Sequence, residues 1–266
     1  MHNTELFLNM IKNYDENQVE KLIDPNDTMK HENYFEVGKS AVEIIKAAIL
    51  SCHINKVDRV LDLPCGHGRV LRHLLKLFPE AKFDACDLDQ DGVEFCARMF
   101  NAQPIVSNED LTRVKFPTTY DLIWVGSLFT HTSKIITERW LTHLSNYLSP
   151  EGIVIATFHG RWSESVHGFL PYINTDKWQE ILKDYSRTGY GYRDYTREES
   201  HTFIEGSYGI SLSKPHSVIE ILEGIPDIRI YLYTERGWAD HHDVVVFGKP
   251  AHNKFIKDPR YFGSQP

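Results

Sequence analysis

The chain has 266 residues, of which 41% are hydrophobic and 25% are charged, and its net charge is -8 at neutral pH. These proportions are typical of a chain that buries one α/β core with additions, so they argue against disorder and a fibrous repeat. No two Lys or Arg residues are adjacent, and because phosphate binding needs a basic face, a nucleic-acid partner is disfavoured.

The amino terminus and the cysteines bear on the cellular compartment. The first residues are mixed and mildly acidic, whereas a signal peptide is basic and then apolar. No segment approaches the roughly 20 apolar residues that cross a bilayer. The four cysteines form no CxxC pair, which is typical of reduced thiols. We therefore expect a cytoplasmic protein with no membrane partner.

Residues 1–56 are predicted to form a helical N-terminal extension, because apolar residues recur there at helical spacing. Strands and helices then alternate along the chain. The predicted strands are 57–63, 82–87, 104–107, 120–126 and 152–160, and the predicted helices are 68–78, 92–100 and 133–148. This alternation implies βαβ units and a parallel sheet.

The predicted domain, 57–250, ends on two further strands at 227–234 and 243–248. A crossover helix does not fit into the short polar segment between them, so these two strands should be antiparallel. The predicted fold class is therefore α/β, with a doubly wound, mostly parallel seven-stranded sheet whose last strand is antiparallel. Residues 251–266 are expected to be a C-terminal tail.

An insertion, 161–213, separates the fifth predicted strand from a helix at about 214–224. Its sequence predicts a helix over 176–186, capped by Thr175 and closed by Gly189, and then a hairpin. The insertion is crowded with aromatic side chains. We interpret the helix and hairpin as a lid that excludes water from an acceptor pocket. The alternative is that half of the aromatic residues form the core of a small subdomain.

The segment Val60–Val70, VLDLPCGHGRV, carries the strongest functional pattern. A buried strand enters a turn in which Gly66 and Gly68 permit positive φ angles and a close approach of a ligand to the backbone. The helix that follows presents its free N–H groups to that ligand. This turn is predicted at the carboxyl edge of the sheet, where doubly wound folds bind ligands.

The same motif resembles the first motif of class I S-adenosylmethionine-dependent methyltransferases, apolar-D-apolar-G-x-G-x-G. Asp62, Gly66 and Gly68 match this pattern, whereas Pro64 replaces its first glycine and cannot adopt a left-handed conformation. The resemblance covers about residues 57–250. It implies S-adenosylmethionine as the cofactor and a small molecule as the methyl acceptor.

The resemblance also implies the cofactor-binding residues. Asp62 would hold the methionine ammonium, and Arg69 is a candidate partner for the carboxylate or a solvated helix residue. Asp87 would accept both ribose hydroxyls, with a helix cap as its alternative role. The segment after the third strand would contact the adenine, and the end of the fourth would pass beneath the sulfonium. The other predicted cofactor residues are Tyr34, Leu63, Pro64, Cys65, Gly66, Gly68, Leu88, Asn108, Glu109, Asp110, Val125, Gly126 and Ser127.

A hydroxyl acceptor requires a base to take its proton, and histidine suits this role near neutral pH. Three histidines follow predicted strands on the cofactor side, and we favour His131 and His159 over His241 as the catalytic base. The acceptor hydroxyl is expected on a sugar or a secondary metabolite. A homodimer is compatible with the sequence.

No metal site is predicted. Residues 87–92 match the start of a calcium-binding loop, but the twelfth position holds Arg98 where a bidentate Glu is required. The histidines show no HxxxH or HExxH pattern. The adjacent His241 and His242 would point to opposite sides of an extended segment.

The sequence leaves two other functions open. An NAD(P)-dependent oxidoreductase also uses a glycine turn and an acidic residue, but Leu71 stands where its third glycine is expected. The second alternative is a non-catalytic cofactor-binding module that regulates a partner. No GxSxG or P-loop motif occurs, which argues against a nucleophile-elbow hydrolase and a P-loop nucleotide hydrolase.

Overall fold

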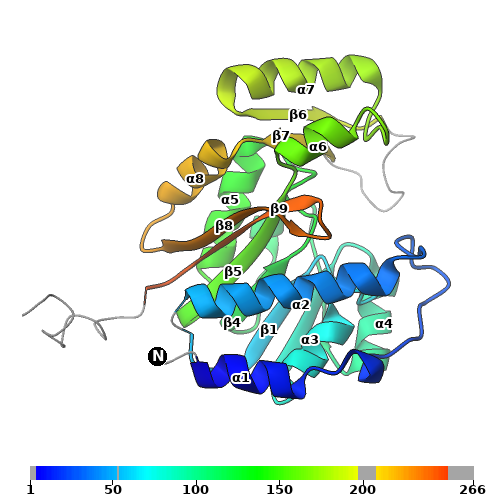
Figure 1. Cartoon of the computed structure of the whole chain (residues 1–266), viewed down its shortest axis with the longest axis vertical. Helices are drawn as coiled ribbons and strands as arrows, with labels where there is room; N and C mark the ends of the chain where they lie inside the picture. The colour runs from blue at the N-terminus through cyan, green and yellow to red at the C-terminus, as the bar shows by residue number, and fades with distance from the viewer. Residues whose placement is uncertain (1–3, 53, 197–207, 251–266) are drawn as a thin grey trace, which may run out of the picture.

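The computed structural model describes residues 4–52, 54–196 and 208–250. The predicted tail, 251–266, and part of the predicted hairpin, 202–207, lie outside the described residues. Figure 1 shows one large sheet flanked by helices, with a smaller helix-and-hairpin unit stacked at one end of it.

The large sheet has seven strands in the order β3-β2-β1-β4-β5-β9-β8. Their bounds are β1 Arg59–Leu63, β2 Lys82–Asp87, β3 Gln103–Val106, β4 Tyr120–Val125, β5 Leu148–Phe158, β8 Arg229–Trp238 and β9 His242–Gly248. Strands β1 to β5 pair in parallel, whereas β9 is antiparallel to both β5 and β8. The predicted fold class and its antiparallel last strand are thus confirmed. Strand β9 lies inside the sheet, however, and β8 forms the edge.

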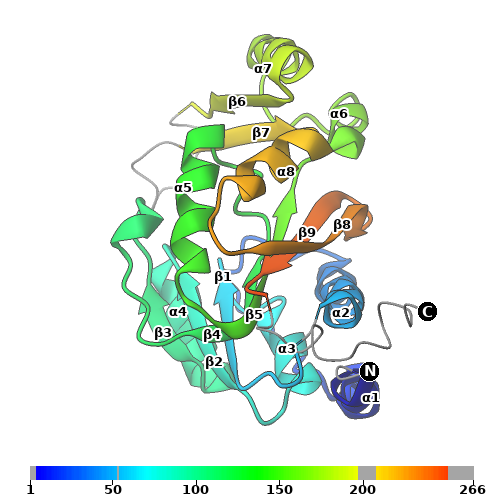
Figure 2. The same ribbon diagram turned by 90° about the vertical axis from the view of Figure 1, so that its left-hand side faces the viewer.

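Helices cover both faces of this sheet (Figure 2). One face is covered by α2 (Tyr34–Ser51), α3 (Leu71–Leu77) and α4 (Gln90–Phe100), with α1 (Thr4–Asn13) outside them, and the other by α5 (Lys134–Ser145) and α8 (Pro215–Glu223). Val60 packs in the first layer and Leu61 in the second, since adjacent strand residues point to opposite faces. Within the described residues, no helix combines the length and apolar composition that a membrane span requires.

Two short 3₁₀ helices, η1 (Glu16–Gln18) and η2 (Leu111–Arg113), complete the connections of the main domain. In α2, the side chains of Val42, Ile45 and Ile49 are fully buried, as their helical spacing predicts. Burial of each such side chain contributes about 1.5–3 kcal/mol, so this face holds α2 against the sheet.

The smaller unit lies between β5 and α8 in the chain. It consists of α6 (Arg161–Val166), α7 (Thr175–Thr188), β6 (Tyr190–Asp194) and β7 (Gly209–Ser213), and the two strands pair antiparallel. The predicted helix and hairpin are present, whereas α6 is not among the predicted helices. Gly189 closes α7 in a left-handed conformation, as predicted.

The predicted cap of α7 is wrong by one residue. The Asn174 side chain accepts a hydrogen bond from the Lys177 N–H, while Thr175 is the first residue of the helix. Both residue types favour the N-cap position, and the side chain one residue earlier in the chain occupies it.

The aromatic residues of this unit divide between its core and a cavity beneath it. Trp178 and Tyr185 are buried in the core of the unit. Tyr172, Tyr195 and Tyr208 line the cavity. The first pair therefore fits the alternative of a subdomain core. The three tyrosines have positions that fit the interpretation as an acceptor pocket.

Candidate active site

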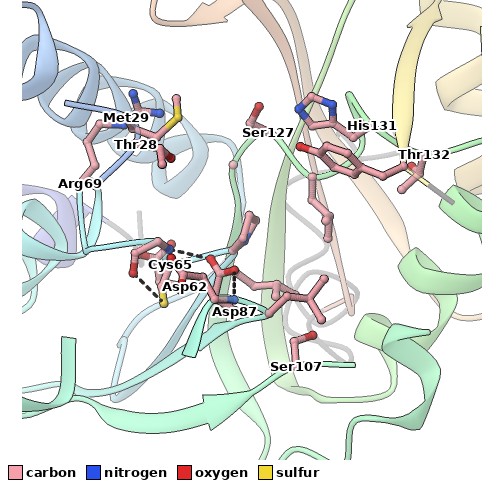
Figure 3. A pocket seen from close by; sticks show the side chains of 18 of the residues that line it. Thr28, Met29, Asp62, Cys65, Arg69, Asp87, Ser107, Ser127, His131 and Thr132 are labelled. Atoms are coloured by element: carbon pink, nitrogen blue, oxygen red, sulfur yellow. Dashed lines mark hydrogen bonds between the residues drawn. The ribbon is translucent and has the colours of Figure 1, made fainter. Parts of the chain in front are cut away.

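A cavity of about 860 Å³ opens at the carboxyl ends of β1, β2, β3 and β4. Ligand pockets typically have volumes of about 300–1,000 Å³. Asp62 and Asp87 lie on one side of the cavity and His131 on the other (Figure 3). The predicted residues that line it are Asp62, Leu63, Pro64, Cys65, Gly66, Arg69, Asp87, Leu88, Asn108, Glu109, Gly126, Ser127 and His131.

The turn between β1 and α3 is fastened to the end of β2. The Gly66 N–H donates to Asp87 Oδ2 at 2.7 Å, and the Cys65 N–H donates to the Cys86 carbonyl at 3.0 Å. The φ angles of Gly66 and Gly68 are 46° and 74°, as the motif predicts. The glycine turn and the Asp87 carboxylate therefore lie side by side at the cavity.

Two backbone donors orient the Asp87 carboxylate. Its Oδ2 accepts from Gly66 and its Oδ1 accepts from the Asp89 N–H at 3.0 Å. Asp89 is the N-cap of α4, because its side chain accepts from the Asp91 N–H, so Asp87 does not have the alternative role of a cap. A carboxylate has about four lone-pair sites, and Asp87 therefore keeps acceptor capacity toward the cavity. Burial is the main cause that raises the pKa of Asp87.

Asp62 is a buried carboxylate at the end of β1, and neither of its oxygens has a hydrogen-bond partner of normal geometry. Burial, and next the charge of Asp87, raise the pKa of Asp62 well above its usual range. A buried carboxylate without a partner is costly, and a neighbouring cation relieves that cost. Since Asp62 lines the cavity, the site fits a ligand with a cationic group, such as the ammonium of S-adenosylmethionine.

The loop after β4 forms the opposite wall. The Nδ1 atom of His131 lies 2.8 Å from the Gly209 carbonyl of β7. Because a carbonyl oxygen only accepts, Nδ1 is the donor, and the lone pair of the neutral ring is on Nε2. Ser127 has a φ of 62°, a conformation that is strained for a residue other than glycine. Its N–H donates to Thr157 Oγ1 at 2.8 Å, which holds the strained loop at the cavity.

The N-terminal segment supplies a third wall, which was not predicted. Asp27, Thr28 and Met29 line the cavity. The Tyr34 hydroxyl donates to Asp27 Oδ2 at 2.7 Å, and Arg72 donates to the Tyr34 hydroxyl at 3.3 Å. Tyr34 is thus buried behind the wall and holds Asp27, which corrects its predicted place beside the cofactor. No sequence motif marks this segment, because its position depends on the path of the chain before α2.

Four other predicted residues also lie off the wall. Val125 is buried within the sheet, and Gly68 packs against α4. Asp110 caps η2 and forms an ion pair with Arg139 of α5. His159 is buried behind His131, with 6.4 Å between their ring centroids. These positions correct the expected contacts with ligands, because the fold already uses each of the four residues.

Comparisons with known proteins bear on the family and the fold of this chain. Residues 61–154 match the family model described as a methyltransferase domain. Residues 61–154 therefore carry a methyltransferase domain, which confirms the resemblance to S-adenosylmethionine-dependent methyltransferases noted in the sequence. S-adenosylmethionine is the cofactor of this class.

Two curated relatives are malonyl-[acyl-carrier protein] O-methyltransferases. The chain is 26% identical over 143 residues to that of Bacillus cereus, with 53% of this chain and 51% of the relative covered. It is 30% identical over 107 residues to that of Halalkalibacterium halodurans, with 38% and 39% covered. The chain spans about half the length of the first relative and less of the second.

Solved structures share the fold at low identity. An S-adenosylmethionine-dependent methyltransferase from Clostridium acetobutylicum superposes with a TM-score of 0.53 at 14% identity, covering 82% of this chain and 92% of the other. DesVI of Streptomyces venezuelae gives a TM-score of 0.52 at 13% identity, covering 86% and 100%. At this identity the likeness shows the fold alone.

The two glycines of the turn provide a matched pair of substitutions. A Cβ at Gly66 meets nothing within 4 Å, so only the positive φ opposes Gly66→Ala, at about 1–2 kcal/mol. A Cβ at Gly68 would lie 2.5 Å from the Phe100 ring, and overpacking adds about 1–3 kcal/mol. We expect urea denaturation to show the larger loss of unfolding free energy for Gly68→Ala. Equal losses would contradict this assignment of the two positions.

Proposed function

We propose that this chain transfers the methyl group of S-adenosylmethionine to a hydroxyl of a small, uncharged acceptor, such as a sugar or a secondary metabolite. The main support is that Asp62, Asp87 and the glycine turn share one cavity with His131. The first group of residues fits the amino-acid and nucleoside parts of the cofactor. His131 offers a base to an acceptor in the same cavity.

The bound cofactor supplies an electrophilic methyl group on a sulfonium, and the task of the chain is to hold the acceptor oxygen close and aligned. In this proposal Asp62 binds the ammonium and Asp87 accepts hydrogen bonds from the ribose hydroxyls. Asn108 and Glu109 follow β3 and line the cavity, so they supply the polar groups for the adenine.

His131 is the residue that we assign to the acceptor proton. Its Nδ1 donates to the Gly209 carbonyl, so Nε2 takes the proton from the acceptor hydroxyl. The same hydrogen bond fixes the ring between the loop after β4 and strand β7. Of the two histidines predicted as the base, His131 is favoured, because His159 lies off the cavity wall.

The charge of the wall favours an uncharged acceptor. Arg69 is the only Lys or Arg among the described residues that line the cavity. Five lining residues are acidic: Asp27, Asp62, Asp87, Asp89 and Glu109. Such a wall repels a carboxylate acceptor, which also needs no base to become a nucleophile. The three cavity tyrosines of the smaller unit offer aromatic faces and hydroxyls, which suit a ring that carries hydroxyl groups.

Calorimetry followed by a transfer assay tests this proposal. The full chain should bind S-adenosylhomocysteine and not NADH. With S-adenosylmethionine as the donor, the release of S-adenosylhomocysteine should then be measured with two panels of acceptors. The first contains hydroxylated sugars and aromatic metabolites, and the second contains malonyl and fatty-acyl carboxylates, free or on acyl-carrier protein. Turnover in the first panel supports the proposal. Turnover only in the second would overturn the acceptor class, and binding of NADH alone would overturn the reaction.

Cofactor affinity should rise with pH through the raised pKa of Asp62. In the free protein, burial keeps the Asp62 carboxyl protonated to a higher pH than usual. Binding of a cation requires the carboxylate, so binding below this pKa must release a proton and becomes weaker by up to about tenfold per pH unit. Calorimetry with S-adenosylhomocysteine from about pH 5 to 8, in buffers of different ionisation enthalpy, measures both the affinity and the proton release.

The variant Asp62→Asn is the control for this pH dependence. It should bind S-adenosylhomocysteine weakly and lose the proton release. Without ligand, Asp62→Asn should also be more stable than the original chain at neutral pH. The pKa of Asp62 is raised in the folded state, so the stability of the original chain declines as the pH rises through that pKa, whereas the asparagine does not ionise. A pH dependence that persists in this variant would assign the effect to another group.

A further inference from the structure

Three histidines meet where β5 ends and β8 turns into β9. His159 follows β5, His241 lies in the turn and His242 begins β9. One ring nitrogen from each lies within 4.8 Å of the other two. The ring centroids are 5.5 Å apart for His159 and His241, and 4.9 Å apart for each of the other two pairs.

This arrangement corrects the expectation that the adjacent pair His241 and His242 would point to opposite sides. That expectation assumed an extended segment. The structure instead has a tight turn, in which Ala239 and Asp240 adopt φ angles of 55° and 52° and the His241 N–H donates to the Trp238 carbonyl at 3.0 Å. The turn brings both rings to the same side, against His159.

The histidine cluster contains buried polar atoms that the protein leaves without partners. The Nδ1 atoms of His159 and His242 are both buried and accept or donate no hydrogen bond. Most buried polar groups in proteins are hydrogen-bonded, so two orphaned nitrogens in one cluster require an explanation.

We propose that His159, His241 and His242 form a binding site for a divalent transition metal ion of the zinc class. Imidazole nitrogens bind zinc at about 2.0–2.1 Å, and tetrahedral geometry then separates the ligand nitrogens by about 3.4 Å. The three ring nitrogens lie within 4.8 Å of one another, so each pair has to approach by at most about 1.4 Å to reach that spacing. Three histidine ligands leave a fourth position for another ligand.

The surroundings of the cluster place this site beside the cavity. The Tyr172 hydroxyl lies 2.8 Å from His241 Nε2, and its ring centroid lies 4.9 Å from that of His159. Tyr172 also lines the cavity. Trp238, another cavity residue, has its ring centroid 5.1 Å from that of His242. The metal ion would therefore lie directly behind the wall on which we place the acceptor, with the Tyr172 hydroxyl next to it.

A second group, formed by Asp24, His67 and Asp91, also has ligand atoms within 4.8 Å. There, however, His67 and Asp91 already pair with each other at 3.0 Å, so no orphaned atom points to an ion.

The test is titration of the full chain with Co²⁺ after removal of metals with a chelator. We expect one equivalent to bind and to give the strong visible absorption of a four-coordinate cobalt ion, which Zn²⁺ then abolishes by displacement. The variants His242→Ala and His241→Gln should weaken binding by at least about 100-fold. The matched control is His216→Ala, because His216 is exposed and outside the cluster, and it should bind cobalt like the unchanged chain.

Binding of S-adenosylhomocysteine shows that the variants are folded, and this readout is independent of metal uptake and of methyl transfer. Absence of cobalt uptake in the unchanged chain would overturn the proposal. The proposal would also be overturned if His242→Ala and His241→Gln both bind cobalt as tightly as His216→Ala does. If Asp91→Asn abolishes uptake and the cluster variants do not, the ion belongs to the second group and the histidine site is wrong.

Discussion

Replacing His131 with alanine should lower the turnover of methyl transfer by about 10²- to 10⁴-fold, the usual contribution of a general base. The Nε2 atom of His131 is the group that takes the acceptor proton in our proposal, and alanine offers no replacement. Because His131 lies across the cavity from Asp62 and Asp87, the affinity for S-adenosylhomocysteine should stay within a few-fold of its original value. Initial rates at saturating acceptor and cofactor measure the first quantity, and calorimetry measures the second.

Three controls separate loss of the base from loss of structure. His131 also donates to the Gly209 carbonyl, so its removal should cost about 0.5–1.5 kcal/mol of unfolding free energy, which denaturation measures. His216→Ala, at an exposed position, should leave turnover unchanged. Added imidazole should partly restore the activity of His131→Ala. An unchanged turnover, or an affinity for S-adenosylhomocysteine that falls as much as turnover, would remove His131 from the role of base.

The parts of the site that follow from local sequence were predictable. A strand, a glycine turn and a helix are contiguous between Val60 and Val70, and the periodicity of the side chains identifies each of them. The position of Asp87 at the site was also predictable. Asp87 ends β2, which pairs in parallel with β1, and β1 leads into the glycine turn. In these segments, the direction of each parallel strand also determines which residues reach the cavity.

The remaining parts depend on contacts between distant segments. Asp27 reaches the cavity because Tyr34 and Arg72 hold it there, and no spacing in the sequence encodes that contact. Asp110 directly follows the cavity residues Asn108 and Glu109 in the sequence. It does not line the cavity, because it forms an ion pair with Arg139 of α5. The histidine cluster was missed because the local rule for an extended strand does not apply within a tight turn.

Replacing Asp87 with alanine should weaken binding of S-adenosylhomocysteine by roughly 10²- to 10³-fold. Hydrogen bonds to a charged acceptor contribute about 1.5–3 kcal/mol each, and in our proposal the carboxylate accepts two from the ribose. The change also leaves the Gly66 and Asp89 N–H groups without their acceptor, so part of the loss comes from a less ordered turn. Asp91→Ala is the matched control, because Asp91 is a nearby carboxylate in the first turn of α4 and lies outside the cavity wall.

The ribose contribution can be measured apart from that of the turn. Adenosine and 2′,3′-dideoxyadenosine differ only in the two hydroxyls assigned to Asp87, so the original chain should prefer adenosine strongly. In Asp87→Ala that preference should nearly disappear, whereas damage to the turn would weaken both nucleosides equally and keep their ratio. Competition against S-adenosylhomocysteine measures the four affinities. A ratio that stays the same in the variant would show that Asp87 supports the glycine turn and does not bind the ribose.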